Sequence, residues 1–234
     1  MPEKPPHGHY RGIGQDLVNL VAVMVLLAAA YFVNKGSFKA FLVWSGVLLY
    51  LLYAYAIYAF DIHFNILFLV YVAILGLSFY ALVGSIIHLH LDDLHPSFVA
   101  NSKARLVSIF LLILGSVFAL LWLREEVSAP IAGSIPLSIV QANLPTNPVH
   151  VLDLAFFLPA VFLTGLLLWK SKPLGYLLAG PLLVFCALMG TAILAIFLVM
   201  SSRGMPTSIG IEAFIALIIA TSLILSVLYI REVK

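Results

Sequence analysis

The positions of the charged residues constrain this chain more than any other feature of its sequence. Its 234 residues include only 12 Lys or Arg and 10 Asp or Glu. A helix needs about 20 mainly apolar residues to cross the hydrocarbon core of a bilayer, and seven stretches between successive charges provide 16 or more. These stretches lie between Asp16 and Lys35, Lys39 and Asp61, Asp61 and Asp92, Arg105 and Arg124, Asp153 and Lys170, Lys172 and Arg203, and Glu212 and Arg231.

One further uncharged stretch does not fit a membrane span. The 26 residues between Glu126 and Asp153 include Pro130, Pro136 and two more prolines. Prolines interrupt helical hydrogen bonding, and lipid offers no partner for the backbone groups that they leave free. We therefore predict a long interfacial loop over residues 124–148.

The uncharged stretches are continuous apolar runs rather than ten-residue alternations, so the spanning elements must be helices and not barrel strands. A content of 63% hydrophobic and 9% charged residues also excludes a soluble domain, which carries about a quarter charged residues, and a disordered chain. The predicted fold is an all-α, polytopic integral membrane bundle forming a single domain over 17–230, between a polar N-terminal tail (1–16) and a C-terminal tail (231–234). The predicted spans are 17–33, 40–60, 65–90, 105–123, 149–169, 174–200 and 208–230.

The distribution of basic residues predicts the orientation. Seven spans place eight Lys and Arg residues at one face of the membrane and four at the other, and the more basic face is usually cytoplasmic. We expect a plasma (inner) membrane protein with its N-terminus outside and its C-terminus in the cytoplasm. The eight basic residues at the predicted cytoplasmic face are Lys35, Lys39, Lys103, Arg105, Lys170, Lys172, Arg231 and Lys234; the four at the other face are Lys4, Arg11, Arg124 and Arg203.

An alternative is that the first apolar run, with Ala28–Ala30, is a cleavable signal peptide.

The fifth span contains the most unusual polar residue. The 16 residues after Asp153 rise only about 24 Å, so the helix must begin before Asp153. Asn147 and Pro148 match the cap and first residue of such a helix, which places Asp153 about one turn inside, with His150 on the same face. Pro159 frees a backbone carbonyl further along. Asp153 is thus either a functional carboxylate within the membrane or a carboxylate that complements the helix dipole.

Other polar residues are expected at the same membrane face as Asp153. We predict a cavity there, lined by tyrosine hydroxyls and rimmed by carboxylates and imidazoles. The alternative for the tyrosines is the aromatic belt at the membrane interface. The candidate residues are Asp153, His150, Glu212, Asp61, His63 and Asn65, with Tyr50, Tyr53 and Tyr58 from the second span and Tyr71 from the third.

The sequence contains one weak metal-binding pattern and no recognised catalytic motif. A helix continued to Pro96 would align His88, Asp92 and His95 at the opposite face, where they could bind zinc or iron or simply be solvated. A single cysteine, Cys186, excludes a disulfide framework and CxxC sites. No HExxH, GxSxG or P-loop motif occurs, and Ala213–Ile230 lacks the lysine that binds retinal in microbial rhodopsins. No cofactor is identified.

Three functions follow from these observations. The first is a non-enzymatic protein, with the lipid bilayer as its partner, that binds or moves a small molecule or a proton through the cavity by means of Asp153 and Glu212. The second is an intramembrane enzyme, in one form metal-dependent, that acts on a lipid-soluble substrate with His150 and Asp153, or His63 and Asp61, as acid and base. The third is an accessory subunit of a membrane complex. A net charge of +2 gives no indication of nucleic-acid binding, and nothing indicates the oligomeric state.

Overall fold

The computed structural model describes residues 6–87 and 103–233, and the regular structure in this part of the chain is helical. Seven of its helical segments are long and apolar enough to cross a membrane, which confirms the predicted seven-helix bundle. They are α1 (Pro6–Val33), α2 (Phe38–Asp61), α3 (Phe68–Ile87), α5 (Ala104–Ile131), a composite span, α9 (Pro173–Ser202) and α10 (Ile209–Glu232). The composite span joins α7 (Pro148–Leu152), a π-helical turn (Asp153–Phe157) and α8 (Leu158–Trp169).

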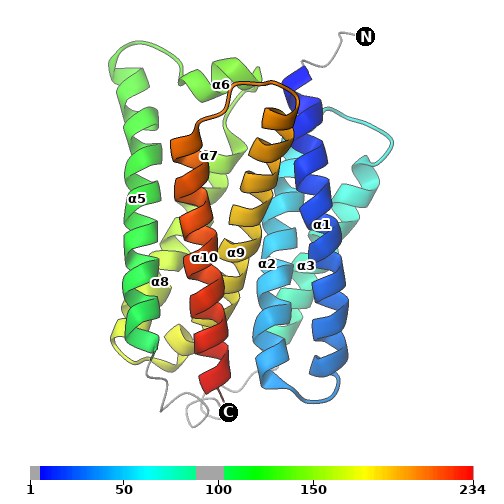
Figure 1. Ribbon diagram of the computed structural model, residues 1–234, viewed down its shortest axis with the longest axis vertical. Helices are drawn as coiled ribbons and strands as arrows, with labels where there is room; N and C mark the ends of the chain where they lie inside the picture. Colours follow the sequence, from blue (N-terminus) through cyan, green and yellow to red (C-terminus); the bar gives the residue numbers. More distant parts are fainter. Residues whose placement is uncertain (1–5, 88–102, 234) are drawn as a thin grey trace.

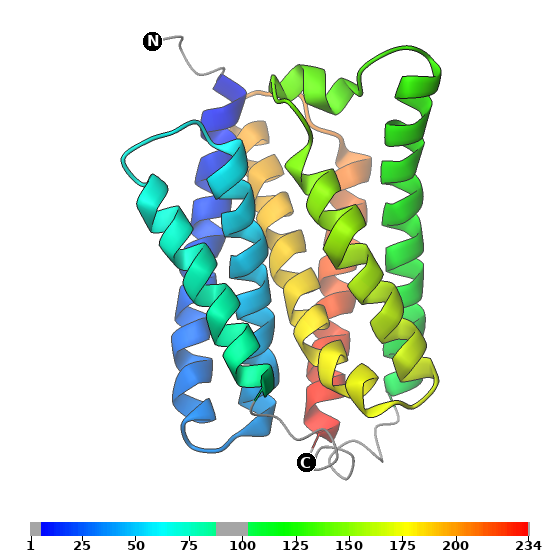
Figure 2. The same cartoon turned by 180° about the vertical axis from the view of Figure 1, so that it is seen from behind.

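Helix α9 is the centre of the bundle. It packs against α1, α2, α8 and α10, while α3 packs on α2 and α5 packs on α8 at the two sides (Figure 1). Figure 2 shows α3 crossing obliquely over α2 at the periphery. We call the end where α1 begins the N-terminal end and the end where α10 finishes the C-terminal end.

Two glycines allow α1 and α2 to approach α9 closely. A Cβ atom on Gly14 would lie 2.7 Å from the Cα atom of Ile196, and one on Gly46 would lie 2.7 Å from the carbonyl oxygen of Pro181. Small residues serve this purpose in membrane helices, because association in lipid depends on close packing rather than on a hydrophobic driving force. Larger side chains at either position would force α9 away from its neighbours.

The interior of the C-terminal half of the bundle is packed mainly with apolar side chains, among a few buried serine and threonine hydroxyls. Leu42, Val107 and Leu183 come from three different spans and are fully buried there. Tyr229 is also fully buried and satisfies its hydroxyl by donating to the Tyr176 carbonyl oxygen at 2.7 Å. Large apolar side chains elsewhere point outward on nearly every span, as expected for helices whose surroundings are lipid.

Several helices extend beyond the predicted spans. Helix α1 begins at Pro6, so much of the segment predicted as a tail is helical. Helix α5 continues through Glu125 to Ile131, and the segment predicted as a loop also contains the short helix α6 (Leu137–Ala142). Charged residues limit the apolar stretch of a helix, but they do not end its backbone hydrogen bonding, so charge spacing underestimates helix length.

Candidate functional site

The composite span begins where the sequence predicts. The Asn147 side-chain oxygen accepts from the backbone N–H groups of Val149 and His150, at 3.0 and 3.3 Å, and Pro148 occupies the first helical position. This cap starts the helix ahead of Asp153, as expected. At 1.5 Å per residue, Asp153 lies about 7.5 Å along the span from Pro148.

The backbone at Asp153 departs from the α-helix. Residues Asp153–Phe157 form a π-helical turn, in which the N–H of Leu158 donates to the carbonyl of Asp153, five residues earlier. Pro159 follows directly and has no N–H to donate to the carbonyl four residues before it. A π-turn inserts one extra residue and changes the direction of the side chains on either side, and such turns are frequent at functional sites. The sequence did not indicate the π-turn, and the free carbonyl expected from Pro159 stays a prediction.

The Asp153 carboxylate is buried and fully engaged. It is only 7% exposed, and its two oxygens accept from the Tyr53 hydroxyl and the Trp122 indole N–H, both at 2.7 Å. The two donors come from α2 and α5, so the carboxylate joins three spans. Hydrogen bonds to an ionised group are among the strongest in proteins, and an unsatisfied carboxylate in the membrane would be costly.

A second polar pair lies beside Asp153. The Nδ1 atom of buried His150 lies 2.6 Å from Glu126 Oε1, and the imidazole ring packs on the Trp122 ring with 4.3 Å between centroids. Trp122 thus contacts both Asp153 and His150. The Glu126 side chain is 30% exposed, so this group reaches from the buried carboxylate toward the N-terminal end of the bundle. We call Tyr53, Trp122, Glu126, His150 and Asp153 the Asp153 network.

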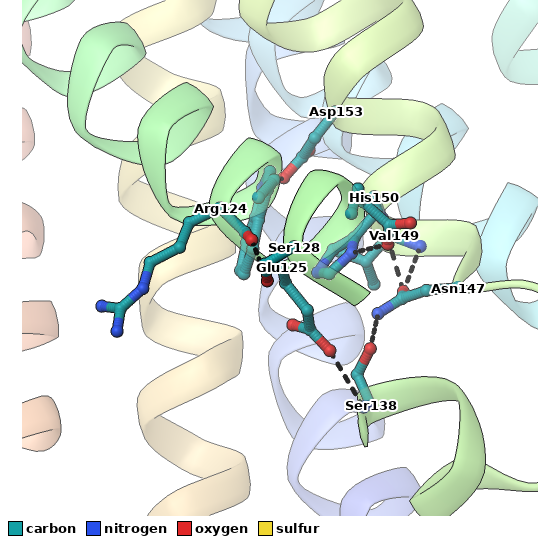
Figure 3. Close-up of polar contacts among 10 residues, drawn as sticks. Arg124, Glu125, Ser128, Ser138, Asn147, Val149, His150 and Asp153 are labelled. Carbon is teal, nitrogen blue, oxygen red and sulfur yellow. Dashed lines mark hydrogen bonds and ion pairs between the residues drawn. The ribbon is translucent and has the colours of Figure 1, made fainter. Parts of the chain in front are cut away.

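The connection between α5 and α7 is tied to the start of the same span. Glu125 accepts from the backbone N–H of Ser138 at 3.0 Å, and Asn147 donates from its side-chain amide to the Ser138 hydroxyl at 3.2 Å (Figure 3). Figure 3 also shows the Arg124 side chain pointing away from Asp153 and His150. Over residues 6–87 and 103–233, no lysine or arginine forms an ion pair with Glu125 or with either carboxylate of the Asp153 network.

Two of the predicted tyrosines contact α1 instead of Asp153. The Tyr50 hydroxyl donates to the Asn19 side-chain oxygen at 2.8 Å and accepts from the Gln15 amide at 2.7 Å. The Tyr58 hydroxyl donates to Asp16 at 2.7 Å. These α1 partners were not predicted, because Gln15 was assigned to the polar tail and only Asn19 to the first span. Their spacing of four residues would place them on one helix face, as the structure does.

The other predicted residues are distributed over the N-terminal end. Tyr71 packs its ring against Tyr58, at 5.2 Å between centroids, and so lies with the tyrosines on the α1 side. Asn65 forms local hydrogen bonds with His63 O and Leu67 N that precede α3. His63 is exposed, Asp61 ends α2, and Glu212 lies in the first turn of α10 with its Oε1 buried and without a hydrogen-bond partner. None of these residues contacts Asp153, and a cavity shared by all of them stays a prediction.

The metal-binding pattern cannot be placed. His88, Asp92 and His95 lie outside the described residues. Within the described ranges, no three His, Cys, Asp or Glu side chains are grouped so that they could hold a metal ion. A metal-dependent form of the enzyme hypothesis therefore finds no ligand set in this part of the chain.

The described residues thus contain two polar groups at the N-terminal end, one around Asp153 and one around Asp16, on different sides of α2. Both groups include a tyrosine of α2, Tyr53 in the first and Tyr58 in the second. Their other side chains come from different helices. Comparison with known proteins adds one finding: no family model, no curated protein and no solved structure matches the chain.

Proposed function

We propose that this multi-pass membrane protein takes up a proton at Asp153 and passes it, alone or together with a small molecule, toward the N-terminal end of the bundle. The observation that carries the proposal is a buried carboxylate inside a span, held at a π-turn by donors from two other spans. Ionisable groups within membrane spans commonly mark proton relays and substrate pathways.

The partners of Asp153 leave its charge uncompensated. The Tyr53 hydroxyl and Trp122 N–H are neutral donors, and in the described chain no lysine or arginine pairs with this carboxylate. Placing a charged side chain at the centre of a membrane costs at least about 2.5–3.5 kcal/mol, and uptake of a proton removes that charge. A proton is the smallest species that would neutralise this group without disturbing the packing around it.

The residues next to Asp153 suit exchange of protons with water. An imidazole can accept a proton on one nitrogen and release one from the other, and His150 lies one turn from Asp153 with its Nδ1 on Glu126. Glu126 is partly exposed, so it can exchange with the aqueous phase at the N-terminal end. The Glu126–His150 contact supports the outer part of a proton path, and the step from His150 to Asp153, one helical turn further, is part of the proposal.

For the direction of the path, we propose that the N-terminal end faces outward and that the protein lies in the plasma (inner) membrane, because the other end carries the larger share of lysine and arginine. A membrane-impermeant maleimide should then label Ser202→Cys in intact cells but label Asn34→Cys only after permeabilisation. Cys186 is buried and should not react. The reverse labelling pattern would invert the orientation.

The central experiment measures proton flux in liposomes containing the purified protein, with a trapped pH-sensitive dye and a potassium gradient made conductive by valinomycin. We expect wild-type protein to accelerate proton entry and Asp153→Asn to reduce the rate at least tenfold, because an amide keeps the shape of the side chain but cannot take up a proton. Asp61→Asn is the matched control, since Asp61 lies at the end of α2 without contact to Asp153.

Two further variants separate loss of function from loss of folding. His150→Gln should lower the flux without changing the elution of the protein on size exclusion, whereas Tyr53→Phe should retain ring packing against Phe157 and Phe185 and reduce the flux less than Asp153→Asn. Equal proton flux in wild-type protein, Asp153→Asn and empty liposomes would contradict proton movement through Asp153.

A further inference from the structure

A second group of side chains lies at the N-terminal end, on the α1 and α3 side of α2. Tyr55 and Tyr58 come from α2, Tyr71 from α3 and Asp16 from α1. The ring centroids are 5.3 Å apart for Tyr55 and Tyr58, 5.2 Å for Tyr58 and Tyr71, and 6.1 Å for Tyr55 and Tyr71. Because Tyr58 also donates its hydroxyl to Asp16, three aromatic rings and a carboxylate meet here. We call these four residues the Asp16 cluster.

The cluster lies at the depth of lipid headgroups. Tyr58 is three residues before the last residue of α2, and Tyr71 is three residues after the first residue of α3. At 1.5 Å per residue, these two positions are about 5 Å inside the ends of their helices, and Asp16 directly precedes the uncharged stretch of α1 that ends before Lys35. Interfacial tyrosines commonly direct their hydroxyls to headgroups, but Tyr58 is buried and uses its hydroxyl on a carboxylate.

Among residues 12–87 and 103–233, no lysine or arginine neutralises the charge of this group. Asp16 is exposed, and its carboxylate accepts a hydrogen bond from the neutral Tyr58 hydroxyl. The C-terminal end differs, because there Lys35 lies over the Tyr31 ring at 4.3 Å and Arg105 lies over the Trp169 ring at 4.6 Å.

No lysine or arginine among residues 12–87 and 103–233 lies over the three rings of the Asp16 cluster in that way. Tyr55 and Tyr71 pack against Tyr58 and against each other, and both are partly exposed, so part of each side chain can be reached by a cation from outside the protein. A carboxylate and several aromatic faces together attract a cation both by its full charge and by the negative faces of the rings.

From these contacts we infer that the Asp16 cluster binds a quaternary ammonium group, supplied either by a phosphatidylcholine headgroup or by a free solute. Such a cation is large and spreads its charge over methyl groups that can lie against ring faces, which is why aromatic cages recognise it. A lysine ammonium is more strongly hydrated and loses more on leaving water. The site is separate from Asp153 and does not depend on proton movement.

The first experiment uses purified full-length protein in neutral maltoside micelles and compares choline with 3,3-dimethyl-1-butanol, its uncharged analogue. Saturation-transfer NMR reports contact of the protein with the methyl protons of each probe. We expect saturable binding of choline, at least tenfold tighter than binding of the alcohol, and a preference that Asp16→Asn largely removes. No saturable signal, or equal binding of the two probes, would overturn the inference.

Variants of one ring test the aromatic contribution. Tyr71→Leu should abolish most of the choline signal, Tyr71→Phe should retain it because the ring remains, and Tyr80→Leu on the same helix should match wild type. Tyr80 is an exposed tyrosine of α3 outside the cluster, so it controls for the loss of an exposed tyrosine from this helix. Equal losses in Tyr71→Leu and Tyr80→Leu, or unchanged choline binding in Asp16→Asn, would contradict the site.

The two sources of the cation are distinguished in lipid nanodiscs. If the natural ligand is a headgroup, phosphatidylcholine nanodiscs should suppress the choline signal, and spin-labelled phosphatidylcholine should show a motionally restricted fraction that Tyr71→Leu reduces. If it is a free solute, choline should bind equally in nanodiscs and micelles. Phosphatidylglycerol, which has no ammonium, should show no restricted fraction that depends on Tyr71.

Discussion

The Asp153 network and the Asp16 cluster are built from the same stretch of α2 but surround their carboxylates differently. Asp153 is buried, both of its oxygens accept hydrogen bonds, and its backbone forms a π-turn. Asp16 is exposed, one of its oxygens accepts from Tyr58, and it lies in a regular helix. A carboxylate inside the bundle needs donors from several helices, whereas one at the rim can be completed by water or by a ligand.

This difference assigns the two groups different kinds of chemistry. A closed group in which each carboxylate oxygen already accepts a hydrogen bond suits the smallest ligand, a proton, and holds it away from bulk water. An open group of aromatic faces beside a carboxylate suits a larger cation from the interface. Variants that remove the donors around each carboxylate should therefore have very different effects on stability.

The largest effect is expected when Asp153 loses both donors. The double variant Tyr53→Phe and Trp122→Phe keeps aromatic rings at both positions but leaves the buried carboxylate without hydrogen bonds. We expect the free energy of unfolding, measured in mixed micelles of maltoside and dodecyl sulfate, to fall by about 3–5 kcal/mol. Adding Asp153→Asn should recover part of this loss, since no charge then stays unsatisfied. A loss below about 1 kcal/mol would mean that Asp153 is not a buried charge.

An intermediate effect is expected at the cap that positions the Asp153 network. Asn147→Ala removes the acceptor for two backbone N–H groups and the tie to Ser138, and should cost about 1–2 kcal/mol. Ser208→Ala is the matched control, because Ser208 precedes α10 but its side chain makes no capping hydrogen bond. The control should change stability by less than about 0.5 kcal/mol. Equal losses in the free energy of unfolding for Asn147→Ala and Ser208→Ala would show that Asn147 has no specific role as a cap.

The smallest effect is expected at the Asp16 cluster. Tyr58→Phe removes the hydroxyl that donates to an exposed carboxylate, which water can solvate instead, so the loss should stay below about 1 kcal/mol. Tyr50→Phe should cost more, because the fully buried Tyr50 hydroxyl is bonded to both Gln15 and Asn19. The same unfolding measurement compares the two variants. A larger loss for Tyr58→Phe would show that Asp16 is inaccessible to water.

The sequence predicted the axial positions of the functional residues better than their partners. Asn147 caps the fifth span as expected, and Asp153 lies about a turn inside it. Tyr50, Tyr53 and Tyr58 were expected to share one cavity, because they fall within one broad arc of α2. In the structure that arc covers two interfaces, so Tyr53 contacts Asp153 while Tyr50 and Tyr58 contact α1. Trp122 and Glu126 lay at the end of another span, and nothing in their spacing indicated that α5 is a neighbour of α7.

The sequence by itself determined the number of spans, their order along the chain and the positions of Asn147 and Asp153 along the fifth span. These follow from a fixed membrane thickness and a constant rise of 1.5 Å per helical residue, so the distance from a charge or cap gives position along the span. Only the tertiary structure decided which helices are neighbours, how each is rotated and where the π-turn lies. Lipid-facing and helix-facing surfaces are both apolar in a membrane protein, so close packing at positions such as Gly14 and Gly46, rather than the hydrophobic pattern, selects the partners.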